Sequence, residues 1–189
     1  MVQCAKWLAK LVKGKVTNTE PPFDTRLNDK YDFAYFEFNE QALDLLSDYS
    51  FLDLDDSKYS SKPNAEQSYI CFGWLKEESK VNPTTKKLQL HSFTFKSQLA
   101  EDKFYEYLKL NHTDHIVLPY DRSTTTIFSD SLPYAPHVRG MSGGPVLSLS
   151  NDIIKLAAIG VEYRSYENVI IGTRIEVILD HIRDSLIVM

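Results

Sequence analysis

The sequence has few cysteines, no long apolar run and no excess of basic residues, and each of these absences excludes a class of protein. Its two cysteines, Cys4 and Cys71, are too few for a disulfide scaffold in 189 residues, so we expect free thiols in a reducing compartment. No apolar run approaches the ~18 residues that a membrane-spanning helix needs. Basic residues are not in excess either: the formal net charge is −5, so no broad positive surface is expected for nucleic acid.

A signal peptide is also missing from the N-terminal sixteen residues. Lys6, Lys10 and Lys13 interrupt the apolar core that such a peptide requires, so the expected location is the cytoplasm. The segment Met1–Val16 instead predicts a short amphipathic helix, which would dock on its own domain or, alternatively, lie on a membrane surface. The apolar face of that helix would hold Cys4, Trp7, Leu8, Leu11 and Val12.

Glycine is scarce as well, but it is concentrated in one place. Three of the seven glycines fall within Gly140-Met141-Ser142-Gly143-Gly144, which Pro145 and an apolar strand follow. Glycine is needed where the backbone approaches another group closely or takes a positive φ. Ser142 would therefore present its hydroxyl on a tight turn whose N–H groups are free to point at a developing negative charge. A glycine-rich hairpin turn without chemistry is the alternative interpretation.

Two motifs carry a resemblance to a known family. The stretch Gly140–Val146 resembles the nucleophile motif of trypsin-like (chymotrypsin-fold) serine peptidases, including the bacterial trypsin-like and HtrA-type branches. Tyr31–Phe36 is similar to the strand that carries the aspartate of the triad, here Asp32. The order of aspartate before serine fits too. The resemblance extends from Asp32 to the C-terminus and implies two six-stranded antiparallel β-barrels with the site in the cleft between them.

The same resemblance implies roles for individual residues. Ser142 would attack a peptide carbonyl, while the N–H groups of Gly140 and Ser142 would form the oxyanion hole. Asp32 would orient a histidine base. A turn residue at a strand start is the plainer reading of that aspartate. This chemistry requires no metal and no cofactor.

Substrate contacts are expected from the strand around Gly160, Val161 and Glu162, which would pair with an extended protein or peptide substrate by strand addition. If Glu162 reached the pocket, it would favour a basic side chain in the substrate. The alternative is an exposed strand glutamate with no part in specificity.

The histidine base has no counterpart in the sequence. The family places it ahead of the aspartate, yet residues 1–31 contain no histidine, and none of the five later ones lies in a sequence that matches the base motif. Either the first strands, with the histidine, precede Met1 in the natural protein, or the chain is a peptidase-like domain that binds peptides without cutting them. The five histidines are His91, His112, His115, His137 and His181. The pair His112 and His115 lacks a third ligand at suitable spacing, so no metal site is predicted.

The predicted fold is mostly β. Residues 1–189 would form one trypsin-like unit, with an incomplete first barrel and the N-terminal helix in residues 1–60, and the second barrel with a C-terminal helix in residues 65–189. A short helix or helical loop is predicted at Glu40–Asp48 and a polar surface loop at Asp53–Asn64. Strand-like runs with polar turns between them indicate antiparallel sheet. These runs are Tyr69–Leu75, Leu88–Phe95, Lys103–Leu110, His115–Tyr120, Ile153–Tyr163 and Val169–Ile175, and the helix is Val177–Val188.

Overall fold

The computed structural model describes residues 43–44, 59, 67–123, 125 and 135–187. The chain divides into two compact units, Met1–Asp53 and Leu54–Met189, and nearly all of the described residues belong to the second. Residues 43 and 44 are helical, within the segment where a short helix is predicted. The predicted helix at Met1–Val16, the strand with Asp32 and all of the loop at Asp53–Asn64 except Tyr59 lie outside the described residues.

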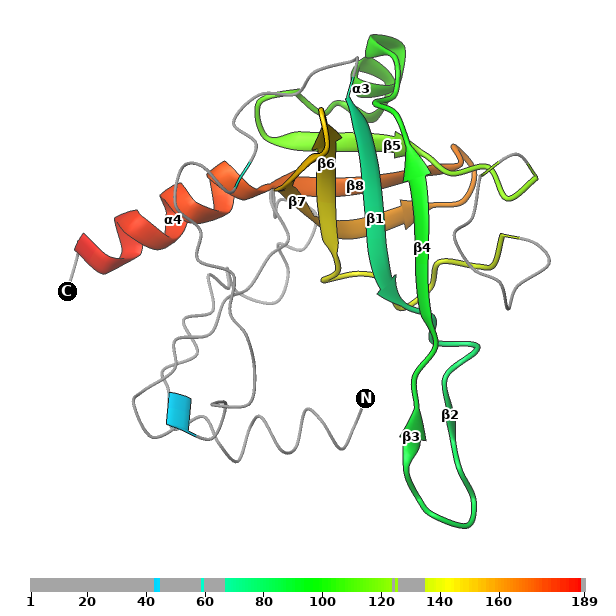
Figure 1. Ribbon diagram of the computed structural model, residues 1–189. Helices are drawn as coiled ribbons and strands as arrows, with labels where there is room; N and C mark the ends of the chain where they lie inside the picture. Colours follow the sequence, from blue (N-terminus) through cyan, green and yellow to red (C-terminus); the bar gives the residue numbers. More distant parts are fainter. Residues whose placement is uncertain (1–42, 45–58, 60–66, 124, 126–134, 188–189) are drawn as a thin grey trace, which may run out of the picture. The chain divides into compact units, whose positions relative to one another are not determined.

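The second unit is built on antiparallel sheet, as the alternating apolar pattern predicts (Figure 1). Its main sheet has six strands in the order β4-β1-β6-β7-β8-β5, and β2 and β3 form a separate two-stranded ribbon. The six strands are β1 Ser68–Trp74, β4 Ser92–Ser97, β5 His115–Pro119, β6 Pro145–Ser150, β7 Ile153–Arg164 and β8 Val169–Arg174, and the ribbon strands are β2 Lys80–Val81 and β3 Leu88–Gln89.

The two edge strands of the main sheet, β4 and β5, approach each other. Just beyond β4, the N–H of Ala100 donates to the carbonyl oxygen of Val117 in β5 (2.9 Å). The Ser97 hydroxyl donates to the carbonyl oxygen of Pro119 (2.8 Å). In the described part of the chain these bonds do not extend into a strand ladder, so the sheet curls on itself without closing into a barrel.

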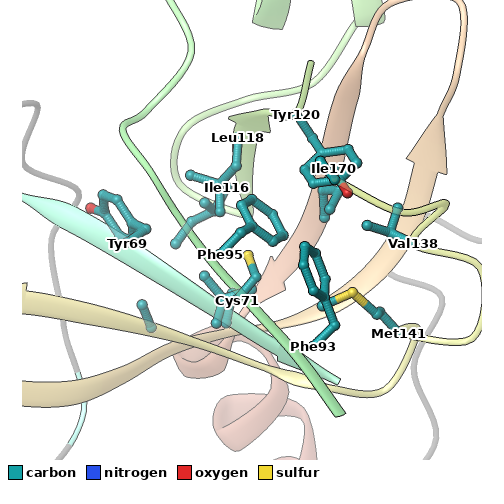
Figure 2. Packing of buried hydrophobic residues seen from close by; sticks show 14 of the residues in the cluster. Tyr69, Cys71, Phe93, Phe95, Ile116, Leu118, Tyr120, Val138, Met141 and Ile170 are labelled. Atoms are coloured by element: carbon teal, nitrogen blue, oxygen red, sulfur yellow. The ribbon is translucent and has the colours of Figure 1, made fainter. Parts of the chain in front are cut away.

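The core lies on the concave side of this curled sheet. Alternate residues of β1 and β4 are buried, which sends Tyr69 and Cys71 inward from β1 and Phe93 and Phe95 inward from β4. Figure 2 shows these side chains gathered with Tyr120, whose ring centroid is 4.7 Å from that of Phe95. Their burial holds the central strands in register, and this register positions the loop that enters β6.

A second cluster of buried residues covers the other face of β5 and β8. It explains why one segment that the sequence predicts as a strand is a helix. The run Lys103–Leu110 is not a strand: it is helix α3, Asp102–Leu108. Tyr105 and Leu108, three residues apart, are buried on one helical face, against Val117 and Val169. Tertiary packing on a sheet that is buried on both sides overrides the strand preference of the aromatic residues.

The other predicted elements of this unit occur in the structure, with shifts at their ends. The predicted strand Leu88–Phe95 is divided into β3 and β4 by exposed residues 90 and 91. The C-terminal helix is α4, Ile175–Ile187, which begins two residues before the predicted start and directly after β8. The strands β1, β5, β7 and β8 match their predicted ranges to within a residue or so.

Candidate functional site

The glycine cluster forms a tight loop between a buried segment and β6. Val138 and Met141 are buried, and they belong to the core cluster of Figure 2. The N–H of Met141 donates to the carbonyl oxygen of Val138 (3.1 Å), closing a turn over Arg139 and Gly140. Because both ends of this turn are anchored in the core, the residues after it are held in a fixed place at the surface.

Two glycines allow the loop to lie directly against β1 and the chain that follows it. Gly140 has a φ of +100°, and a Cβ there would come within 2.8 Å of the backbone oxygen of Trp74 and the backbone nitrogen of Lys76. A Cβ on Gly144 would overlap the carbonyl oxygen of Phe72 and lie 2.9 Å from that of Met141. Glycine is therefore required at both positions because the backbones lie in contact.

Hydrogen bonds tie the same loop to β7. The N–H of Gly143 donates to the carbonyl oxygen of Gly160, and the N–H of Gly160 donates to that of Gly144, each at 2.8 Å. Immediately afterwards the register between β7 and β8 shifts between Gly160 and Glu162. Such a bulge turns the strand locally. The loop is therefore held from β1 on one side and from β7 on the other.

Ser142 is exposed at the centre of this loop and lines a cleft of about 590 Å³. The N–H groups of Met141, Gly143 and Gly144 are used in backbone hydrogen bonds. Among the described residues, no acceptor is found for the N–H groups of Gly140 and Ser142. An exposed hydroxyl therefore lies beside two unused backbone donors, and an anion in the cleft could be bound by them.

The three residues predicted to contact substrate all line this cleft: Gly160, Val161 and Glu162. The carboxylate of Glu162 pairs with Arg164, with Nε and Oε2 3.1 Å apart, and its side chain is 50% exposed. The carboxylate that would favour a basic side chain in the substrate thus already has a cationic partner on the same strand.

Several further residues line the cleft that were not predicted from the sequence, His137 and Tyr163 among them. His137 precedes the turn and lines the cleft, and so does Tyr163, which follows Glu162 on β7. Burial raises the pKa of the Tyr163 phenol, while the nearby Arg122 partly opposes that rise. The available signal was proximity in sequence to the glycine loop and to the predicted substrate strand, but neither residue lies in a motif.

The predicted aspartate of the triad and the five histidines are the remaining candidates for catalysis. Asp32 lies outside the described residues, so its position relative to Ser142 stays a prediction. Of the five histidines, all of which the structure describes, only His137 lines the cleft. His112 instead pairs with Asp102 (3.2 Å) and stacks on Tyr105. No group of three or more side chains suited to holding a metal ion occurs in the described part of the chain.

Compared with known proteins, the chain matches no family model, no curated protein and no solved structure. Within the ranges that the structure describes, no helix has the length and apolar character to cross a membrane. The geometry around Ser142 and the sequence motifs are therefore the basis for assigning a function.

Proposed function

We propose that the chain is a trypsin-like serine endopeptidase unit, with Ser142 as its nucleophile. The observation that carries this proposal is the exposed Ser142 hydroxyl on a loop clamped by glycines, beside the two unused N–H groups of Gly140 and Ser142. A hairpin turn without chemistry would not require its backbone to be fixed against two strands while its central hydroxyl faces a cleft.

The fold is in keeping with this proposal. Six antiparallel strands with approaching edges, followed by a C-terminal helix, are what the second barrel of residues 65–189 would need. The first barrel and Asp32 would come from residues 1–60. The proposed reactivity of Ser142 rests on its own loop and does not require the two-barrel arrangement.

In the proposed mechanism, Ser142 Oγ attacks a peptide carbonyl and the carbonyl carbon becomes tetrahedral. The N–H groups of Gly140 and Ser142 hold the oxyanion, and removing one such donor typically lowers turnover about 10²–10³-fold. A histidine oriented by Asp32 would accept the serine proton and return it to the leaving amine. No residue of this chain is assigned as that histidine.

The substrate would bind along β7. Residues 162–164 of β7 pair with β8 on one side, but β6 ends its pairing with β7 at Pro145 and Ile159. Among the described residues, the other edge of this part of β7 has no strand partner, and it borders the cleft. An extended peptide could add there as a further strand, with its carbonyl close to Ser142.

Covalent labelling tests the proposal. A fluorophosphonate probe should modify the full chain at one site, and Ser142→Ala should abolish the modification, as measured by intact mass and peptide mapping. Ser150→Ala, at the far end of β6, is the matched control and should retain it. Persistent labelling of Ser142→Ala, or mapping to another residue, would contradict the assignment of the nucleophile.

A second function is favoured by one observation: no histidine matches the base motif, and only His137 lines the cleft. A catalytically inactive peptidase-like domain would use the same cleft and the free edge of β7 to bind peptides as a scaffold module. Loss of the base alone is severe, since in subtilisin it lowers kcat by about 2 × 10⁶. Peptide binding that Val161→Pro weakens, without any fluorophosphonate labelling, would favour this alternative.

A further inference from the structure

The β2–β3 ribbon stands apart from the rest of the second unit. It projects beyond the ends of β1 and β4 (Figure 1), and every residue from 80 to 92 is exposed. Two-stranded ribbons are at best marginally stable alone.

Hydrogen bonds within the ribbon define its turn. The side chain of Asn82 accepts from the N–H groups of Thr84 and Thr85 at 2.9 and 3.0 Å. The N–H of Asn82 donates to the carbonyl oxygen of Lys87 (2.8 Å), and Lys86 takes the left-handed conformation that the turn requires, with a φ of +56°. The backbone of both strands is thereby pre-shaped for a partner, which reduces the entropy lost on binding.

Its two faces differ sharply. Val81 lies directly opposite Leu88 in the register, and both are exposed, at 59% and 37%. Leu90, directly after β3, is a further exposed aliphatic side chain, at 45%. Lys80 lies opposite Gln89 on the other face. Lys87 directly precedes β3, and its carbonyl oxygen accepts from the N–H of Asn82.

The charge of the ribbon is of one sign. Residues 79–92 contain three lysines and no acidic residue, in a chain whose net charge is −5. Lysines on an exposed ribbon discourage pairing with a second copy of itself. They attract a partner of opposite charge.

We propose that the β2–β3 ribbon is a docking surface for an extended polypeptide segment in which aliphatic and acidic residues alternate, and which adds to the ribbon as a further strand. Side chains of a strand point alternately to opposite faces. In such a segment the aliphatic residues would extend the face of Val81 and Leu88, and the acidic residues would lie beside Lys80 and Lys87. The outer edges of β2 and β3 have no strand partner in the described part of the chain, so backbone donors and acceptors are available.

The base of the ribbon lies beside the glycine loop. The N–H of Lys76 donates to the carbonyl oxygen of Arg139 (2.8 Å), next to Gly140. A segment held on the ribbon is therefore tethered near the cleft, which would raise the local concentration of the chain to which it belongs. The docking itself does not depend on the chemistry of Ser142.

Binding to a synthetic peptide tests this inference with the full chain. A fluorescein-labelled octapeptide of alternating leucine and aspartate should bind, measured by fluorescence anisotropy. A peptide of the same composition, with four leucines followed by four aspartates, should bind far more weakly because its side chains cannot match both faces. Binding should weaken with added salt, since exposed charges are screened.

Matched variants locate the surface. The double variant Lys80→Glu/Lys87→Glu should weaken binding about tenfold, because two attractions become repulsions. Lys96→Glu, an exposed lysine on β4, should change it less than about twofold. Absence of binding, equal binding of the blocked peptide, or equal losses in both variants would overturn the inference. So would binding only to anionic vesicles or to an oligonucleotide. Labelling of Ser142 is scored separately, so failure of either proposal is recognised independently.

Discussion

Replacing Gly144 by alanine is the most direct perturbation of the loop that carries Ser142. A Cβ at this position would overlap the carbonyl oxygen of Phe72 and lie 2.9 Å from the carbonyl oxygen of Met141. Both neighbours are backbone atoms, so no side chain can rotate away to make room. The φ of Gly144 is not in the left-handed region, so the expected effect is steric.

The expected loss of stability follows from the displacement of the loop that the added methyl group would cause. Forcing an extra methyl group into a packed site costs about 1–3 kcal/mol. Moving the loop also weakens two hydrogen bonds, from Gly144 to Met141 and from Gly160 to Gly144, at about 1 kcal/mol each. The free energy of unfolding should therefore fall by about 3–5 kcal/mol, which lowers Tm by about 10 °C in a chain of this size.

Thermal unfolding followed by circular dichroism measures this loss, and Gly160→Ala is its matched control. Its Cβ would lie 3.5 Å from the carbonyl oxygen of Gly144, an ordinary van der Waals contact. We expect Tm of Gly160→Ala to lie within about 2–3 °C of the wild type. If Gly144→Ala shifted Tm no more than Gly160→Ala does, the close backbone approach would not hold the loop.

Three further predictions concern the second unit. Burial raises the pKa of the Cys71 thiol, so in a Cys4→Ser background iodoacetamide should modify Cys71 only after unfolding. Above the usual thiol pKa, the Cys71 thiol ionises in the unfolded chain but not in the folded one. The free energy of unfolding should therefore fall as the pH rises past that pKa, and in denaturant titrations Cys71→Ala should lose this part of the pH dependence. Glu176→Gln removes the carboxylate that pairs with the buried Arg174 at 2.8 Å, and it should destabilise the fold by about 3 kcal/mol. Asp180→Asn, which breaks an exposed pair on the same helix, should change it by less than about 0.5 kcal/mol; equal losses would contradict the role of burial.

Much of the second unit could be predicted because its local signals agree with its packing. Alternation in β1 and β4 reflects one buried face, and the apolar runs of β5 and β8 reflect burial on both. Helix α3 could not be predicted in the same way, because its aromatic residues favour a strand until the sheet beneath them is known.

The candidate site could be predicted only in part from the sequence. The glycine spacing indicated a close approach around Ser142, but nothing local showed that Phe72 and Trp74, far away in sequence, supply the backbone that is approached. His137 and Tyr163 line the cleft close in sequence to predicted site residues, but no motif singled them out. Glu162 and Arg164 lie two residues apart on one face of β7, so their ion pair could have been inferred once β7 was predicted as a strand.

The pairing of β1 with β6 also has a consequence for how the chain folds. This central ladder joins Cys71 to Val146, so it can form only after most of the second unit has been synthesised. Contacts between such distant segments make folding slow, because a long loop must close before they form. Until then, β1 and β4 can pair as a hairpin in which the edge of β1 that later pairs with β6 has no partner strand. Since the loop of Ser142 is seated against β1, this loop should be among the last features of a newly made chain to form.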